Sequence, residues 1–213
     1  MNFFGHAAIA RDSAPGVVLG AMLPDFATMC GGRIERADDA DVAAGIDLHH
    51  ATDAVFHQLP AVVGLMHELD DRLLAASCAR GPRRATAHIG VELLLDGILV
   101  DEPAYRAAYL AGLACDPALT WRDADAAPRF TALLGRLRGF GVPDDLRRPD
   151  AITHRIQRIL APRPLLAPSP DDLRAIRGAL VEFQPRVEVA SETILRGVRA
   201  GVTPPPPRSA TPG

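Results

Sequence analysis

Helical signals dominate this sequence, and the alternation of apolar and polar residues that is typical of half-buried strands is nearly absent. Prolines and glycines divide the chain into segments with helical spacing of apolar residues. A chain of 213 residues, 48% of them hydrophobic, is long enough for one full hydrophobic core. The sequence therefore predicts an all-α fold, with a single helical bundle domain over residues 1–200 and a disordered, proline-rich tail over residues 201–213.

Proline and glycine positions predict where the helices begin and end. We expect Ser13 and Pro15 to be the N-cap and first-turn proline of a helix that Pro24 bends or interrupts and that stops at Gly31. The other helices are predicted over residues 38–77 with a break at Pro60, 82–114 with a restart near Pro103, 124–138, 150–160 and 170–199.

Charge and cysteine content limit the partners and the compartment. The formal net charge of -3 is too close to neutral to predict a nucleic-acid-binding protein. Cys30, Cys78 and Cys115 are too far apart for a CxxC unit, and an odd cysteine number favours a reduced, cytoplasmic protein.

His6 and Arg11 interrupt the first apolar segment, which is unlike a signal peptide, and no apolar run approaches the roughly 18 residues of a membrane span. We expect neither nucleic-acid nor membrane partners, and the oligomeric state is not determined by these features.

Histidine and carboxylate side chains recur at helical spacing in the first predicted site segment. His49, Asp53 and His57 follow one another at four-residue intervals, so they project from about the same face of one helix. His50 lies one position further round that helix. Imidazole and carboxylate groups bind Mn, Fe, Zn or Mg, and such an ion lowers the pKa of a water molecule that can then attack phosphorus near neutral pH.

A second segment repeats this pattern with His88, Glu92 and Asp96. A polar stripe of this kind is often only the solvated face of an amphipathic helix. Glu92 and Asp96, however, lie in the apolar segment IGVELLLDGILV, and a buried carboxylate requires a metal ion, a cation or several hydrogen-bond donors. Asp25, in GAMLPDFA, has a similar setting, although a turn or capping role after Pro24 is the alternative.

Other polar residues have two interpretations. His6 has apolar neighbours on both sides and is either a hydrogen-bonded core residue or a ligand. Arg83 and Arg84 precede the second stripe and are candidates for binding phosphate, with surface charge at a helix start as the alternative. All 23 basic residues are arginines, which suits phosphate recognition but is also explained by GC-rich coding. His67 and His154 are expected at the surface.

Five segments, in order along the chain, resemble the acyl carrier protein phosphodiesterase family, also called ACP hydrolases. The segments are MNFFGHAAIA, GAMLPDF, GIDLHHATDAVFHQLPAV, VELLLDGIL and FQPRVEVAS. This family is distantly similar to HD-domain phosphohydrolases, so the resemblance implies an HD-like helical bundle. It also implies a divalent metal, manganese or magnesium in the first place and iron or zinc as other possibilities. The implied reaction hydrolyses the phosphodiester that joins 4'-phosphopantetheine to a serine of acyl carrier protein.

The spacing of these residues and the resemblance together lead to a hypothesis for the roles of individual residues. The expected metal ligands are His6, Asp25, His49, Asp53 and Asp96. His88 and Glu92 are expected as further ligands or as partners behind the ligands. Asp25, His50 and His57 are the expected catalytic residues, and either His50 or His57 would protonate the departing serine oxygen.

Three positions differ from the family pattern. His50 and His57 stand where the family has an arginine and an acidic residue, and Gly97 stands where it has a histidine. The two histidines add potential ligands, which is compatible with a different metal or a second metal site. Two other functions are compatible with the same residues: a metal-dependent phosphoesterase for a nucleotide or lipid substrate, and a helical module that binds metal or carrier protein without catalysis.

Overall fold

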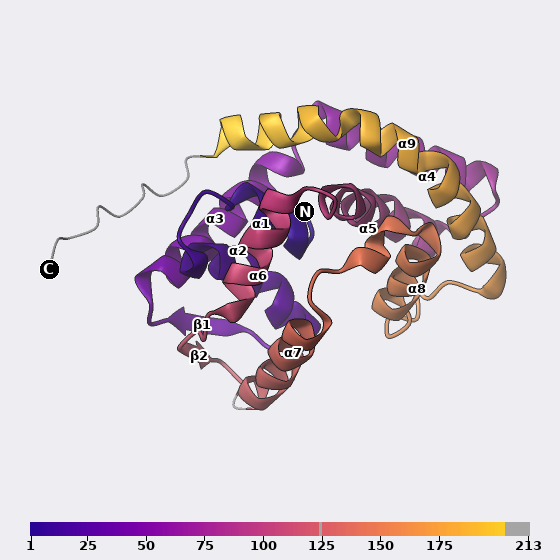
Figure 1. Cartoon of the computed structure of the whole chain (residues 1–213). Helices are drawn as coiled ribbons and strands as arrows, with labels where there is room; N and C mark the ends of the chain where they lie inside the picture. Colours follow the sequence, from indigo (N-terminus) through magenta and orange to yellow (C-terminus); the bar gives the residue numbers. More distant parts are fainter. Residues whose placement is uncertain (124, 203–213) are drawn as a thin grey trace, which may run out of the picture. The chain divides into compact units, whose positions relative to one another are not determined.

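The structure, a computed structural model, describes residues 1–123 and 125–202, and these residues are mainly helical (Figure 1). The predicted all-α class is therefore confirmed. Within the described residues the helices are α1 (Phe3–Ile9), α2 (Pro15–Met29), α3 (Ala40–Phe56), α4 (Pro60–Ala75), α5 (Arg80–Leu99), α6 (Pro103–Ala114), α7 (Ala126–Phe140), α8 (Pro149–Leu160), α9 (Pro170–Gly201) and the short 3₁₀ helix η1 (Asp144–Arg147). Strands β1 (Ile34–Ala37) and β2 (Leu119–Trp121) form one antiparallel ribbon, which the sequence did not predict.

The chain divides into two compact units, and each is described separately. The first unit contains residues 1–55 and 102–142 together with the described end of α9 from residue 198. The second unit contains residues 56–101 and 143–197. The single domain that the sequence predicts for residues 1–200 stays a prediction.

Helix α1 is buried along its whole length in the first unit. It packs against α2 and α6, where the ring of Phe3 lies 5.5 Å from that of Phe26 and the ring of Phe4 lies 5.2 Å from that of Tyr109. The apolar residues on both sides of His6 thus face neighbouring helices. As a result, the His6 side chain is held in the core, where it cannot exchange freely with solvent.

Two glycines allow α2 and α3 to approach each other at backbone distance. A Cβ atom on Gly20 would lie 2.2 Å from the carbonyl oxygen of Val42, and a Cβ atom on Gly45 would lie 2.2 Å from that of Val17. No side chain fits at such distances, so glycine is required at both positions. This close approach brings the next turn of α3, which carries His49, against the backbone of α2.

In the second unit, α5 packs against α4, α8 and η1. A Cβ atom on Gly97 of α5 would lie 2.1 Å from the carbonyl oxygen of Leu146 in η1. The backbone of η1 therefore occupies the space that a side chain at position 97 would need. Glycine is therefore required at position 97.

Asp172, in the first turn of α9, connects that helix to the start of α5. Its Oδ1 accepts a hydrogen bond of 2.7 Å from the backbone N–H of Ala79, the N-cap residue of α5. Its Oδ2 accepts hydrogen bonds from the backbone N–H and the hydroxyl of Ser169, at 2.9 and 2.7 Å. Burial raises the pKa of Asp172, but these hydrogen bonds outweigh burial and hold the pKa below its ordinary value.

Most predicted helix boundaries are confirmed, with one error. Pro60 and Pro103 each begin a helix, as the sequence predicted. The prediction that Ser13 caps α2 was wrong, because the N-cap residue is Ala14 and its side chain makes no capping hydrogen bond. Helix α2 also continues through Pro24 to its end at Met29.

The C-terminal helix is longer than predicted. Helix α9 runs to Gly201, which is the first residue of the predicted tail, and the following Val202 is buried. Residues 203–213 of that predicted tail lie outside the described residues. Within the described chain, no helix has both the length and the apolar character that crossing a membrane requires.

Candidate metal centre and adjoining cavity

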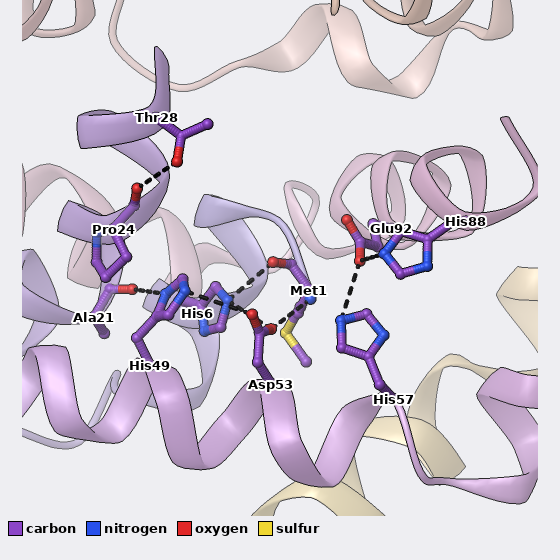
Figure 2. A network of polar contacts seen from close by, with 10 residues as sticks. All are labelled: Met1, His6, Ala21, Pro24, Thr28, His49, Asp53, His57, His88 and Glu92. Carbon is purple, nitrogen blue, oxygen red and sulfur yellow. Dashed lines mark hydrogen bonds and ion pairs between the residues drawn. The ribbon is translucent and has the colours of Figure 1, made fainter. Parts of the chain in front are cut away.

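Three residues of the first unit bring potential metal ligands together (Figure 2). They are His6 on α1 and His49 and Asp53 on α3, and one ligand atom of each lies within 4.8 Å of the other two. Nε2 of His49 is 3.5 Å from Oδ2 of Asp53, and Nε2 of His6 is 3.3 Å from Oδ1. His49 and Asp53 are one helical turn apart, so the predicted shared face of this pair is confirmed.

The backbone of α2 fixes the orientation of His49. Its Nδ1 lies 2.9 Å from the carbonyl oxygen of Ala21. A carbonyl oxygen only accepts, so Nδ1 carries the hydrogen and donates it. The lone pair is then on Nε2, the nitrogen that faces Asp53 (Figure 2). A ligating histidine is commonly held in this way, with its other nitrogen donating to a carbonyl group.

His6 has the opposite arrangement of its nitrogens. Its Nε2 donates a hydrogen bond of 2.9 Å to the carbonyl oxygen of Met1, so the lone pair lies on Nδ1. Among the described residues, Nδ1 of His6 is buried and has no hydrogen-bond partner. A buried polar atom without a partner costs about 1–3 kcal/mol. The His6 ring therefore keeps one buried nitrogen that a ligand could satisfy, while its other nitrogen, Nε2, lies 3.3 Å from Asp53.

Burial and mutual contacts determine the protonation states of the three side chains. Burial lowers the pKa of His6, and burial together with the neighbouring His6 lowers the pKa of His49 to about 3. Burial raises the pKa of Asp53, but hydrogen bonds from His6 and from the Met1 ammonium group, whose nitrogen is 2.7 Å from Oδ1, bring it below its ordinary range. Both imidazoles are thus neutral at pH 7 and the carboxylate is ionised. These are the protonation states in which such groups bind metal ions.

The distances between ligand atoms also fit a divalent ion. A tetrahedral ion with bonds of about 2.0–2.2 Å separates its ligand atoms by about 3.3–3.6 Å. Nε2 of His49 lies 3.5 Å from Oδ2 of Asp53, and one ligand atom of His6 lies within 4.8 Å of the ligand atoms of both residues. The donor set of two nitrogens and one oxygen suits Mn, Fe or Zn better than a hard ion that prefers only oxygen ligands. The residues present therefore fit a divalent metal.

A cavity of about 530 Å³ opens in the first unit beside His50. It lies among α2, α3 and β1, and its volume is within the range of small-molecule binding sites. The imidazole rings of His49 and His50 meet edge to face, with centroids 5.4 Å apart. His50 therefore connects the metal cluster to the cavity. The charged and imidazole side chains of the lining are Arg33, Glu35, Arg36, Asp47, His50 and Arg122.

Residues 1–79 match the family model of acyl carrier protein phosphodiesterase. The resemblance predicted from the motifs is confirmed over this segment, which contains His6, His49 and Asp53. The matched segment ends before α5 begins at Arg80, so it includes neither Glu92 nor Asp96. No curated protein and no solved structure matches the chain, and the HD-like relationship stays a prediction.

Two of the predicted ligands are not members of such a cluster. Among the described residues, neither Asp25 nor Asp96 belongs to a group of three close ligand atoms. Asp25 is half-buried on α2, directly after Pro24, which lines the cavity. Asp96 is fully buried on α5 in the second unit. Their roles as ligands, and the catalytic role of Asp25, stay predictions.

The predicted stripe of His88, Glu92 and Asp96 also contributes to a cluster, but His57 is its third member in place of Asp96. His88 and Glu92, one turn apart on α5, lie together with His57, and one ligand atom of each is within 4.8 Å of the others. The predicted shared face of His88 and Glu92 is confirmed. The burial predicted for Asp96 is confirmed as well, whereas the Glu92 side chain is 13% exposed.

The two arginines predicted to bind phosphate have different surroundings. Nε of Arg83 forms an ion pair of 3.0 Å with Oδ1 of Asp70, and only 14% of the Arg83 side chain is exposed. Arg84 is exposed. Their phosphate role stays a prediction. His67 and His154 are exposed, as expected.

Sequence reasoning missed the arginines of the cavity. Arg33 and Arg36 lie at β1, and Arg122 directly follows β2. The ribbon brings them together, because Arg36 pairs with Thr120 and the backbone N–H of Arg122 donates to the carbonyl of Arg33. Strands of four and three residues are too short to produce a recognisable alternation of apolar and polar residues.

Proposed function

We propose that this chain is a metal-dependent phosphodiesterase that removes 4'-phosphopantetheine from the serine of an acyl carrier protein. The orientation of His49 carries the proposal, because its Nε2 lone pair faces Asp53 while Nδ1 is held by the Ala21 carbonyl. The family match over residues 1–79 supports the reaction class, since the family name denotes a phosphodiesterase for acyl carrier protein.

The metal would be held by His6, His49 and Asp53, with manganese as the preferred ion and magnesium, iron or zinc as other candidates. A divalent ion bound there supplies an activated water molecule and charge stabilisation at phosphorus. His49 is already oriented for binding. His6 keeps a buried nitrogen without a hydrogen-bond partner in the described structure, and ligation would satisfy this atom.

The cavity residues would bind and protonate the substrate. Guanidinium groups form paired hydrogen bonds with phosphate oxygens, so Arg33 and Arg122, which line the cavity, would bind the phosphodiester. During hydrolysis, the oxygen of water bonds to phosphorus and the bond between phosphorus and the serine oxygen breaks. The departing oxygen needs a proton, and His50 is the histidine that lines the cavity. The products are the serine hydroxyl and the phosphate monoester of pantetheine.

The direct test measures conversion of holo-carrier protein to the apo form by mass spectrometry, with Mn²⁺ present. Asp53→Asn and His49→Gln are expected to lower kcat/KM by at least about 100-fold, because even the partners behind metal ligands change activity by about 10–100-fold. His67→Gln changes an exposed histidine and should retain the wild-type rate. A purification tag belongs at the C-terminus, because the Met1 ammonium group contacts Asp53. Full activity of Asp53→Asn would overturn the proposal.

The same preparation distinguishes the other functions. Hydrolysis of bis-p-nitrophenyl phosphate without conversion of holo-carrier protein would indicate a phosphoesterase for a smaller nucleotide or lipid substrate. Metal binding without hydrolysis of either substrate would indicate a non-catalytic module that binds metal or carrier protein.

A further inference from the structure

The second unit contains a separate group of imidazole and carboxylate ligands (Figure 2). His57 directly follows the end of α3, while His88 and Glu92 lie on α5. Nε2 of His57 is 3.6 Å from Oε1 of Glu92, and Nε2 of His88 is 3.3 Å from the same oxygen. Ligand atoms around a tetrahedral ion with bonds of about 2.0–2.2 Å are about 3.3–3.6 Å apart. Both nitrogen–oxygen separations therefore match one coordination sphere, and all three ligand atoms lie within 4.8 Å of one another.

Aromatic contacts restrict the position of His57. Its ring meets the fully buried ring of Phe56 edge to face, with centroids 5.2 Å apart and planes at 80°. Its ring also stacks on that of His88, with centroids 4.7 Å apart and planes at 15°. Pro60 begins α4 shortly afterwards, so His57 lies in a short connection between two helices. The imidazole is thus held in place before any ligand binds, which lowers the entropy cost of binding.

The burial of the three side chains suits an ion-binding site that is open on one side. The Glu92 side chain is 13% exposed, whereas His57 and His88 are 33% and 51% exposed. Burial raises the pKa of Glu92, but a hydrogen bond from His88 and nearby positive charge outweigh it and hold the pKa below its ordinary value. Solvent reaches the cluster from the side of His88, which leaves a path for an ion.

A protonated histidine beside Glu92 is an alternative to a bound ion. Two cationic rings stacked at 4.7 Å would repel each other, so this alternative places a proton on only one of the two imidazoles. A bound ion is compatible with two neutral imidazoles beside an ionised carboxylate.

We propose that His57, His88 and Glu92 form a second metal site that binds Zn²⁺. Two imidazoles and one carboxylate are a ligand set found at zinc sites that keep a position open for water or substrate. Mg²⁺ and Ca²⁺ prefer oxygen ligands and are expected to bind more weakly here. The site is additional to His6, His49 and Asp53, and it does not depend on the proposed hydrolysis.

Zinc stoichiometry tests this site directly. The metal-free full chain is dialysed against buffered Zn²⁺, and the bound zinc is measured by elemental mass spectrometry. The wild type is expected to bind two ions per chain, while His88→Gln and the isosteric Glu92→Gln should weaken one of them by at least about 100-fold. His67→Gln is the matched control, since it removes an exposed histidine from α4, and it should bind two ions. Circular dichroism verifies the fold of each variant.

The outcomes separate the two proposed sites. If His88→Gln and Glu92→Gln both bind as much zinc as the wild type, the second site is wrong. If only the first site is wrong, the wild type binds one ion, which His88→Gln removes and Asp53→Asn retains. If the wild type binds one ion, which Asp53→Asn removes and His88→Gln retains, the first site is supported and the second site is wrong. Substitution with Co²⁺ gives a further readout, because the visible absorption in His88→Gln should lose the contribution of one of the two sites.

Discussion

The imidazole rings of His6 and His49 stack with their centroids 3.9 Å apart and their planes at 25°. Two positive charges at this separation would repel each other strongly in a buried site. The stacking therefore agrees with the lowered pKa values of both histidines. The cluster is prepared to bind a cation because the protein itself places no charge on either ring.

The first prediction concerns the pH dependence of the metal-free protein. An unfolded histidine takes up a proton near its ordinary pKa of 6.5, whereas His49 in the folded chain does so only at about 3. The unfolded state therefore binds more protons as the pH falls below 6.5, and the free energy of unfolding decreases. For each histidine, the free energy of unfolding changes by at most about 1.4 kcal/mol per pH unit. Asp53, whose pKa is lowered by folding, adds a further loss below its ordinary value of 3.8.

Urea denaturation at pH 5, 6 and 7 measures this slope. His49→Gln cannot take up the proton, so its free energy of unfolding should change less steeply with pH than that of the wild type. His67→Gln alters an exposed histidine and should keep the wild-type slope. An unchanged slope in His49→Gln would show that its protonation is not coupled to folding.

The second prediction concerns the close approach of α2 and α3. In Gly45→Ala, the new methyl group would lie 2.2 Å from the Val17 carbonyl oxygen, so α3 must move away from α2. Such overpacking destabilises a protein by about 1–3 kcal/mol. The shift also lengthens the hydrogen bond between His49 and Ala21, and metal affinity at His49 should fall. Thermal denaturation and metal titration measure the two effects.

Gly64→Ala is the matched control for this substitution. Gly64 also lies inside a helix, α4, but beyond the backbone of its own helix and its two chain neighbours no atom lies within 4 Å of the position of its added Cβ. Alanine is favoured over glycine in helix interiors by about 0.5–1 kcal/mol, so this variant should be more stable than the wild type. Equal stability of the two alanine variants would contradict the importance of the α2–α3 contact.

Local sequence rules predicted the helices well because the relevant interactions are local. Pro60 and Pro103 begin helices because a proline in the first turn has no N–H group to leave unsatisfied. The β1–β2 ribbon depends on pairing between segments far apart in the sequence, so local patterns could not reveal it. The expected cap at Ser13 failed because the N-cap residue of α2 is Ala14, one residue later, and alanine has no side chain that could cap the helix.

The third prediction concerns the carboxylate that joins α9 to α5. In Asp172→Ala, the backbone N–H of Ala79 and both donors of Ser169 lose their acceptor. Hydrogen bonds to a charged group contribute about 1.5–3 kcal/mol, so the free energy of unfolding should fall by about 2–3 kcal/mol. Asp171→Ala is the control, because the ion pair of Asp171 with Arg174 is exposed and such pairs contribute about 0–1 kcal/mol. Similar losses in both variants would contradict the capping role of Asp172.

Four-residue spacing predicted which residues share a helix face, but not where the helix ends. The spacing grouped His57 with His49 and Asp53. In the structure α3 ends at Phe56, and His57 lies with His88 and Glu92. Phe56, the last residue of α3, is fully buried, and this tertiary packing cannot be read from four-residue spacing. Spacing therefore found the pairs His49–Asp53 and His88–Glu92 but not the third member of either cluster.

The fourth prediction concerns the arginines of the cavity. If they bind the phosphodiester, Arg33→Ala and Arg122→Ala should each raise KM for holo-carrier protein with a smaller effect on kcat. The loss of one charge-assisted hydrogen bond, about 1.5–3 kcal/mol, corresponds to an increase of about 10–100-fold in KM. Steady-state kinetics at several salt concentrations measure the effect, and the variants should also depend less on salt because one cationic contact is lost.

Arg196→Ala is the matched control for the cavity variants. Arg196 is an exposed arginine on α9 that pairs with Glu192, and it does not line the cavity. Its removal changes the net charge by the same amount, so any long-range attraction of an acidic carrier protein changes similarly. An equal rise in KM for Arg196→Ala and Arg122→Ala would mean that net charge, and not the cavity, determines binding. A rise confined to the cavity variants would assign the phosphodiester to the space beside His50.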